Sequence, residues 1–294
     1  MSTTLVAGAT GYLGRHLAEE LHRRGHRVRV IARNRERAER PGPWGAPGLA
    51  DLADEWAIGE VTDPLFTASL AEEVDHVVSA LGVTRQKADP WEVDNLANLA
   101  LLRSAQEHGA RSFTYVNVLD GDRCPAALTR AKSAFAQTLT ASDITSQVVN
   151  PPGYFSDMTE ILEMARRGVV PLLRPSALIN PIHGADLAHY TVDRLESPQS
   201  GSWDVGGPDV LTWRKLAATA FRALGTRPRT ITVPAPVLTP ALRVLGLVSP
   251  RLADTASFTT WGMTRDTVGP PTGTHHLEDF FAQQAQRLER GGTR

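Results

Sequence analysis

The segment Val6-Ala7-Gly8-Ala9-Thr10-Gly11-Tyr12-Leu13-Gly14 spaces glycines at every third position between two patterns of apolar residues. Before it, residues 3–8 predict a buried strand. After it, residues 12–24 predict an amphipathic helix, because Leu17 and Leu21 share one face. The turn between them presents a helix N-terminus, where free backbone N–H groups and the positive end of the helix dipole attract phosphate. Its glycines permit a tight bend and close approach of a ligand, so the segment predicts a pyrophosphate-binding turn.

A second strand pattern, residues 26–33, follows one helix later and completes a β-α-β unit. In dinucleotide-binding proteins this strand is commonly followed by Asp or Glu, which binds the ribose hydroxyls of NAD. Here the strand ends in Ala32-Arg33-Asn34, and a guanidinium group suits a 2′-phosphate instead. We therefore predict that Arg33, helped by Arg37, selects NADPH over NADH. The alternative is that both arginines belong to a solvated charged run over residues 33–40.

The composition of the 294-residue chain is that of a globular protein that can bury a large core. A formal net charge of −1 argues against broad capture of nucleic acid or of an anionic membrane surface. The single cysteine, Cys124, excludes an intrachain disulfide and any multi-cysteine metal site, and a cytoplasmic compartment fits best. We expect no metal, no signal peptide and no membrane span, because no apolar run approaches ~20 residues.

Strand and helix patterns alternate through the first half of the chain, which predicts a parallel sheet. The further predicted strands cover residues 56–60, 76–81, 113–118, 145–150 and, more briefly, 177–183. The further predicted helices cover residues 90–108, 154–167, 185–195, 212–224 and 276–290. We expect an α/β fold, a Rossmann-type doubly wound parallel sheet with a small C-terminal substrate lobe. The NADP-binding core is expected over residues 1–150, and the lobe, interleaved with the last sheet elements of one globular unit, over residues 151–294.

An ordered set of motifs runs through most of the chain. The motifs are Gly8-Ala9-Thr10-Gly11-Tyr12-Leu13-Gly14, Val61-Thr62-Asp63, Ala80-Leu81-Gly82, Tyr115-Val116-Asn117-Val118, Ala131-Lys132-Ser133-Ala134-Phe135, Asn150-Pro151-Pro152-Gly153-Tyr154-Phe155-Ser156-Asp157-Met158 and Ile182-His183-Gly184-Ala185-Asp186-Leu187-Ala188. Together they resemble the short-chain dehydrogenase/reductase superfamily, specifically its atypical NmrA-like branch. The set is far more specific than any one member. The resemblance implies a Rossmann-type fold that binds NADP(H).

The resemblance also implies where the cofactor is bound. The implied cofactor-binding residues are Gly8, Thr10, Gly11, Tyr12, Leu13, Gly14, Arg33, Asp63, Ala80, Leu81, Gly82, Lys132 and Pro151. Asp63 is placed near the adenine, where a carboxylate can accept a hydrogen bond from the amino group. Small residues at 80–82 let the dinucleotide lie close to the backbone. For Asp63, an ordinary Asp-Pro turn with Pro64 is the alternative.

The catalytic positions of that family are kept only in part. Most members carry a Ser, a Tyr and a Lys, and the alignment places Asn117, Leu128 and Lys132 there. Leu128 has no ionisable proton, so it cannot act as a general acid. Lys132, on the same helical face, can bind the nicotinamide ribose and stabilise negative charge, unless it is an exposed helix lysine. Asn117 can polarise a substrate carbonyl, or can simply form the turn after a strand.

The proton of a reduction then needs another source. Tyr154, after the Pro-Pro-Gly bend, and His183, at the end of a short strand predicted to face the lobe, are the candidates. His183 suits the role better, because imidazole exchanges protons near neutral pH. Both residues can equally be packed side chains. A substrate phenol beside the ketone is a further source, and it leaves only orientation and hydride transfer to the protein.

These observations predict an NADPH-dependent ketoreductase. Its expected partner is a small-molecule ketone, small or polycyclic aromatic and polyketide-like, as in antibiotic pathways. The chain is expected to be a monomer or homodimer. Because some NmrA-like proteins bind NADP(H) without turnover, a redox-sensing regulator is the alternative. An epimerase is disfavoured by the missing tyrosine, since reversible oxidation of an alcohol usually needs a base there.

Overall fold

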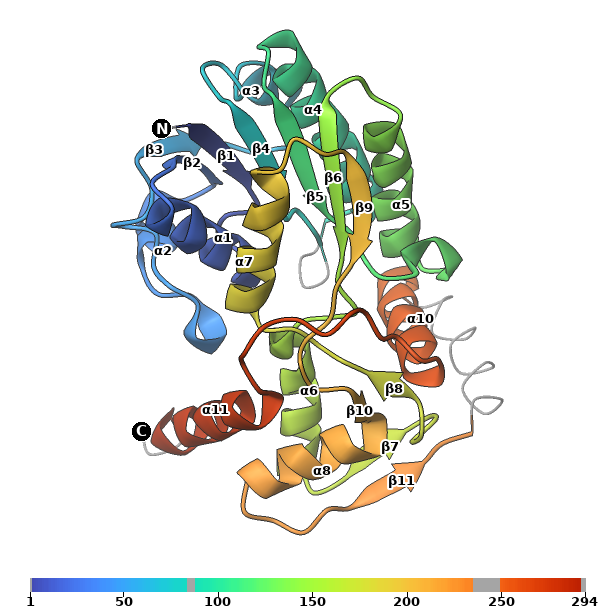
Figure 1. The fold of residues 1–294 in the computed structure, drawn as a ribbon. Helices are drawn as coiled ribbons and strands as arrows, with labels where there is room; N and C mark the ends of the chain where they lie inside the picture. Colours follow the sequence, from blue (N-terminus) through green and yellow to red (C-terminus); the bar gives the residue numbers. More distant parts are fainter. Residues whose placement is uncertain (1, 84–87, 235–248, 292–294) are drawn as a thin grey trace. The chain divides into compact units, whose positions relative to one another are not determined.

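The computed structural model describes residues 2–83, 88–234 and 249–291 and forms two compact units (Figure 1). The first unit comprises Met1–Asp122, Ala127–Asn150 and Gly184–Asp204. The second comprises Arg123–Ala126, Pro151–His183 and Val205–Arg294. The chain thus leaves the first unit after Asn150 and returns to it for residues 184–204, which the predicted core over residues 1–150 does not include.

A seven-stranded parallel sheet forms the centre of the first unit, in the order β3-β2-β1-β4-β5-β6-β9. The strands are β1 (Thr3–Ala7), β2 (Arg27–Ala32), β3 (Glu55–Ile58), β4 (His76–Ser79), β5 (Ser112–Val116), β6 (Thr145–Asn150) and β9 (Gly201–Asp204). The strand order reverses between β1 and β4, and open α/β sheets bind ligands at such a switch point. The predicted Rossmann-type doubly wound fold is confirmed.

Helices cover both faces of this sheet (Figure 1). On one face α1 (Tyr12–Arg23) packs against α7 (Gly184–Leu195), near the short α2 (Arg35–Glu39). On the other face lie α3 (Pro64–Ala68), the π-helical turn η2 (Trp91–Ala97), α4 (Asn98–Glu107) and α5 (Ala127–Thr140). The short 3-10 turns are η1 (Pro43–Gly45) and η3 (Gly121–Arg123). The largest core cluster lies under α4 and α5, where Phe135 packs edge-on against Tyr115 with ring centroids 4.7 Å apart.

The second unit combines helices with two small sheets. Its helices are α6 (Phe155–Arg166), α8 (Trp213–Ala223), α10 (Pro250–Thr264) and α11 (Leu277–Gly291), and α8 packs against both α6 and α11. One small sheet pairs β8 (Leu178–Ile179) with β10 (Leu211–Thr212). The other pairs β7 (Val170–Leu172) with β11 (Thr230–Thr232).

Most predicted elements are confirmed to within two residues at either end, but one is much shorter than predicted and several observed elements were not predicted. The strand predicted over 177–183 extends only from Leu178 to Ile179. Pro181 has no N–H to donate, and the Asn180 side chain donates to the carbonyls of Gly207 and Gly269 instead. The elements β7, β9, β10, β11 and α10 were not predicted, because none of them has a clear apolar period.

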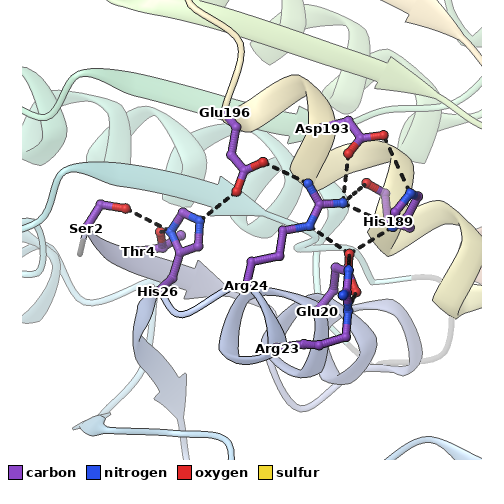
Figure 2. Close-up of polar contacts among 9 residues, drawn as sticks. All are labelled: Ser2, Thr4, Glu20, Arg23, Arg24, His26, His189, Asp193 and Glu196. Atoms are coloured by element: carbon purple, nitrogen blue, oxygen red, sulfur yellow. Dashed lines mark hydrogen bonds and ion pairs between the residues drawn. The ribbon is translucent and has the colours of Figure 1, made fainter.

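A charged cluster around Arg24 ties the end of α1 to α7 (Figure 2). The Arg24 guanidinium donates to Glu20 at 2.8 Å and pairs with Asp193 and Glu196 at 2.7 Å each. His26, at the start of the neighbouring strand, lies 3.1 Å from Glu196. Burial alone would raise the pKa of Glu196, but hydrogen bonds from His26 and Arg24 lower it.

The same cluster predicts a loss of stability in acid. The hydrogen bond from Arg23, helped by Arg24 and His189, outweighs burial and lowers the pKa of Glu20 from 4.5 to about 2. Because the pKa of Glu20 is lower in the folded than in the unfolded chain, its carboxylate stabilises the folded state at pH values above 4.5. This contribution is lost as the pH falls from 4.5 towards 2. Glu20→Gln should therefore cost about 2 kcal/mol of unfolding free energy at neutral pH, and the cost should shrink steadily in acid.

Urea unfolding at a series of pH values would test this expectation. The control is Glu107→Gln, which changes an exposed glutamate at the end of α4. An equal, pH-independent effect of the two substitutions would contradict the assignment of the stability to the Arg24 cluster.

Candidate functional site

An open cleft lies in the first unit where β1, β2 and β4 end. Its volume is about 170 Å³. Of the predicted cofactor-binding residues, those that line it are Gly8, Thr10, Gly11, Arg33, Ala80, Leu81 and Gly82. They come from three segments that are far apart in sequence, and the parallel register brings the ends of their strands to one edge of the sheet.

The glycine turn has no room for a side chain at Gly8 or at Gly14. Gly8 has a φ of 78°, and a Cβ there would lie 2.7 Å from the carbonyl oxygen of Ala80. A Cβ at Gly14 would overlap the carbonyl oxygen of Gly8 and lie 2.7 Å from the Cα of Ala9. Gly11 is the N-cap of α1 and has no side chain to satisfy the first N–H groups of the helix. The turn is therefore a cradle that fits a pyrophosphate.

Arg15 lies directly behind this cradle and was not identified from sequence. Its buried guanidinium donates to the Thr10 carbonyl at 3.1 Å and to the Ala38, Arg40 and Pro47 carbonyls at 3.0, 2.8 and 2.7 Å. Burial, and secondarily Arg37, lower the pKa of Arg15. Because these carbonyl partners carry no formal charge, the guanidinium adds positive potential beside the phosphate site. It also ties the segment after α2 to the turn.

The two predicted adenosine contacts differ in their placement. Arg33 is exposed and lines the cleft directly after β2. Asp63 does not line the cleft, because its carboxylate accepts a hydrogen bond from the Leu65 backbone at 2.9 Å and caps α3. This is the Asp-Pro turn that the sequence left open. Residues 59–62, immediately before it, line the cleft instead.

Five further predicted cofactor contacts lie outside the cleft lining: Tyr12, Leu13, Gly14, Lys132 and Pro151. Tyr12 and Leu13 are buried in the first turn of α1, and the Tyr12 hydroxyl accepts a hydrogen bond from Gly184 at 3.1 Å. Pro151 is buried and belongs to the second unit. Contacts of these residues with a cofactor stay predictions.

Lys132 is a buried residue of α5, so the alternative of an exposed helix lysine does not hold. Only 7% of the residue is exposed. Its Nζ donates to the Leu81 carbonyl at 2.9 Å and pairs with Asp94 Oδ1 at 3.0 Å. It also lies 5.1 Å above the centre of the Tyr115 ring. Burial raises the pKa of Tyr115 well above its ordinary value, so this phenol stays neutral.

Asp94 is the second site residue that sequence reasoning missed. It lies in η2, is fully buried, and belongs to the helix predicted over residues 90–108. A signal was present in the sequence. Asp94 and Asn98 are polar residues one helical turn apart, at positions where the pattern of Leu101 and Leu102 points inward. Burial raises the pKa of Asp94, and the Lys132 ammonium opposes this shift.

Asn117 and Leu128 complete the positions derived from the family pattern. The Asn117 amide donates to Asn150 Oδ1 at 3.1 Å, and Asn150 in turn donates to Asp204 at 3.0 Å. One of the two N–H donors of the NH₂ group predicted to polarise a substrate carbonyl is therefore used within the sheet. Leu128 is buried in the core one turn before Lys132.

The two predicted proton donors belong to the second unit. His183 stacks on His275 with ring centroids 4.2 Å apart and meets the Phe155 ring edge-on at 5.6 Å. The Tyr154 backbone donates to Asp157 at 3.0 Å, where the residue caps α6. Both residues thus have packing or capping roles, and catalytic roles for them stay predictions.

The described residues offer neither a metal site nor a membrane-spanning helix. Among residues 2–83, 88–234 and 249–291, no group of three or more His, Cys, Asp or Glu side chains is placed to hold a metal ion. No helix in that part of the chain has the length and apolarity to cross a membrane.

Comparisons with known proteins agree with this geometry. Residues 8–198 match the model of a family described as NAD(P)H-binding. The divinyl chlorophyllide a 8-vinyl-reductase of Zea mays is 32% identical over 279 residues, which cover 87% of this chain and 69% of that protein. The ceramide reductase of Caulobacter vibrioides is 28% identical, over 79% of this chain and 73% of its own length.

Solved structures show the same fold at low identity. The NADPH-dependent quinone oxidoreductase of Escherichia coli, complexed with NADPH, superposes with a TM-score of 0.75 at 18% identity, over 97% of this chain and 99% of that chain. The Citrobacter sp. triphenylmethane reductase, complexed with NADP(H), superposes with a TM-score of 0.74 at 16% identity, over 96% and 99%. At these identities the likeness establishes the fold alone.

Proposed function

Because the chain belongs to the NAD(P)H-binding family, we propose that it is an NADPH-dependent reductase that adds hydride to an electron-poor double bond of a flat, conjugated substrate. One observation carries this proposal. Helix α5 brings Lys132 to the floor of a dinucleotide cleft but has Leu128 where a proton-donating phenol would stand. NADPH supplies the hydride when it is bound. The residues of the chain then stabilise negative charge and hold the substrate, and no tyrosine stands at position 128 to deliver the proton.

A conjugated carbon–carbon double bond suits such a site best. Hydride addition to a vinyl group on an aromatic ring spreads the negative charge over the ring, so water can protonate the product without a positioned acid. The buried Lys132 ammonium provides a fixed positive charge for this intermediate. The Zea mays relative, a vinyl reductase, supports the choice of bond.

A ketone of a polycyclic aromatic, polyketide-like substrate is the second candidate. The same ammonium would stabilise an alkoxide, and with Leu128 on α5 in place of a phenol, the substrate could bring its own proton donor. A phenol beside the ketone would serve.

The cytoplasmic location and the monomeric or dimeric state also remain proposals from the sequence. The names of the plant relatives place those proteins in the chloroplast.

The test is turnover of NADPH with a panel of purified substrates. We expect divinyl chlorophyllide a or a similar vinyl-substituted macrocycle to gain one H₂ by mass spectrometry, with stoichiometric NADPH oxidation. Reduction of aromatic ketones alone, and only of those with a neighbouring hydroxyl, would favour the second candidate. Tight NADPH binding without turnover of any substrate would overturn both and favour the redox-sensing regulator.

Cofactor preference gives a separate prediction. Arg33→Asp should shift the ratio of NADPH to NADH affinity about 50-fold towards NADH, because it removes a charged hydrogen bond to the 2′-phosphate worth about 2–3 kcal/mol. Fluorescence titration of both cofactors would measure the ratio. The matched control is Arg35→Asp, which makes the same charge change on α2, where Arg35 pairs with Glu39 at 2.8 Å. Equal shifts in both variants would show that Arg33 acts only through net charge.

A further inference from the structure

The buried pair of Lys132 and Asp94 is the one feature of the cleft that the family pattern leaves unexplained. The two side chains come from α5 and η2 and approach to 3.0 Å. Asp94 is fully buried and Lys132 is 7% exposed. An ion pair this deep costs desolvation energy that hydrophobic residues of similar size would avoid. Stability therefore gives no reason for the pair, and its position indicates a use.

The pair lies directly beneath the floor of the cleft. A Cβ placed at Gly82 would lie 3.5 Å from Asp94 Oδ1 and 3.6 Å from Lys132 Nζ. Lys132 also donates to the carbonyl of Leu81, and Leu81, Gly82 and Val93 all line the cleft. Among the described residues, the backbone of Gly82 lies between the two charges and the cleft, so the ammonium acts there at short range in a water-poor interior.

The groups that face the ammonium allow one assignment of charge. In the described part of the chain, its ionisable contacts are Asp94, from η2, and Tyr115, from β5, whose hydroxyl lies 3.5 Å away. Tyr115 is fully buried and stays neutral, so it cannot balance a cation. The Leu81 and Val116 carbonyls orient Nζ but carry no formal charge. Asp94 is therefore the counter-ion in this set.

We infer that Asp94 is a positioning residue, which keeps Lys132 charged and aimed at the Leu81–Gly82 floor, where its charge stabilises the electron-rich product of hydride addition. The inference rests on the proposed reductase function for its catalytic part. Its structural part, that Asp94 keeps Lys132 protonated inside the protein, is independent of any substrate.

The experiment measures the charge of Lys132 directly in the full-length chain. Isotope-labelled lysine gives few signals, because the chain contains only Lys87, Lys132 and Lys215. Arginine substitutions at 87 and 215 assign them. In the wild type we expect Lys132 to stay protonated over the pH range of activity. In Asp94→Asn it should lose its proton at a lower pH, because the counter-charge is gone. Asp89→Asn, the same charge change at a cap before η2, should leave the signal unmoved.

Kinetics supply the second readout. In Asp94→Asn the alkaline limb of kcat should move to lower pH with the Lys132 signal, with about a tenfold loss of kcat there and an unchanged KM for NADPH. Asp94→Glu, which keeps the charge, should restore most of the activity.

A wild-type Lys132 that is neutral near pH 7 would overturn the inference, even if no variant folds. An alkaline limb of kcat that lies at the same pH in Asp94→Asn as in the wild type would also overturn the inference. If the signal moves as expected but the wild type reduces no substrate, the proposed function fails while the charge assignment stands.

Discussion

Replacing Gly14 with alanine is expected to weaken NADPH binding by about two orders of magnitude. The new Cβ would overlap the Gly8 carbonyl and press on the Ala9 Cα at 2.7 Å, so the cradle has to open. Opening it misdirects at least two backbone N–H groups from the pyrophosphate. At about 1.5 kcal/mol for each hydrogen bond to a charged group, the loss corresponds to roughly 100-fold in affinity. Fluorescence titration of NADPH would measure it.

The chain offers a graded set of controls for this experiment. At Gly11 a Cβ meets only the Gly8 carbonyl, at 3.3 Å, so Gly11→Ala should weaken binding by a much smaller factor. At Gly262, within α10, a Cβ has no neighbour within 4 Å, so Gly262→Ala should leave affinity unchanged. Circular dichroism would establish that each variant is folded. If Gly14→Ala bound NADPH as tightly as the wild type, the cradle would not contribute to cofactor binding.

Replacing Lys132 with methionine is expected to have two large and separable effects. Without the ammonium, kcat should fall about 100-fold or more, because the charge that stabilises the reduced intermediate is lost. The free energy of unfolding should also fall by about 3–5 kcal/mol, because Asp94 is left buried without its partner. Single-turnover kinetics and urea unfolding would measure the two effects independently.

The double variant Asp94→Asn with Lys132→Met separates stability from catalysis. Removing both charges relieves the stranded carboxylate, so most of the unfolding free energy should return while kcat stays low. A double variant that regains activity along with stability would mean that Lys132 serves only the fold. The fraction of folded protein at the assay temperature has to be equal in all variants compared.

The cofactor cradle could be predicted from local pattern because its physics is local. A strand, a glycine turn and a helix are consecutive, and a Cβ at Gly8 or Gly14 would collide with backbone of the same turn or of the adjacent strand end. Arg33 was found for the same reason, since it directly follows the second strand. In contrast, β9 has only four residues and is stabilised by pairing with β6. Because β6 lies far away in the sequence, a local sequence pattern could not predict this strand.

The amino-acid sequence established the Rossmann-type sheet, the cleft at its switch point, and the absence of a phenol at Leu128, because each depends on residue type or on short-range periodicity. The tertiary structure alone decided where Lys132 lies and which groups it contacts. It joined this lysine to Asp94 on another helix, buried both under Gly82, and bound the Asn117 amide to Asn150. Burial and the distance to other charges set the energy of a charged group. Both depend on how distant parts of the chain pack together, so they cannot be read from the order of residues.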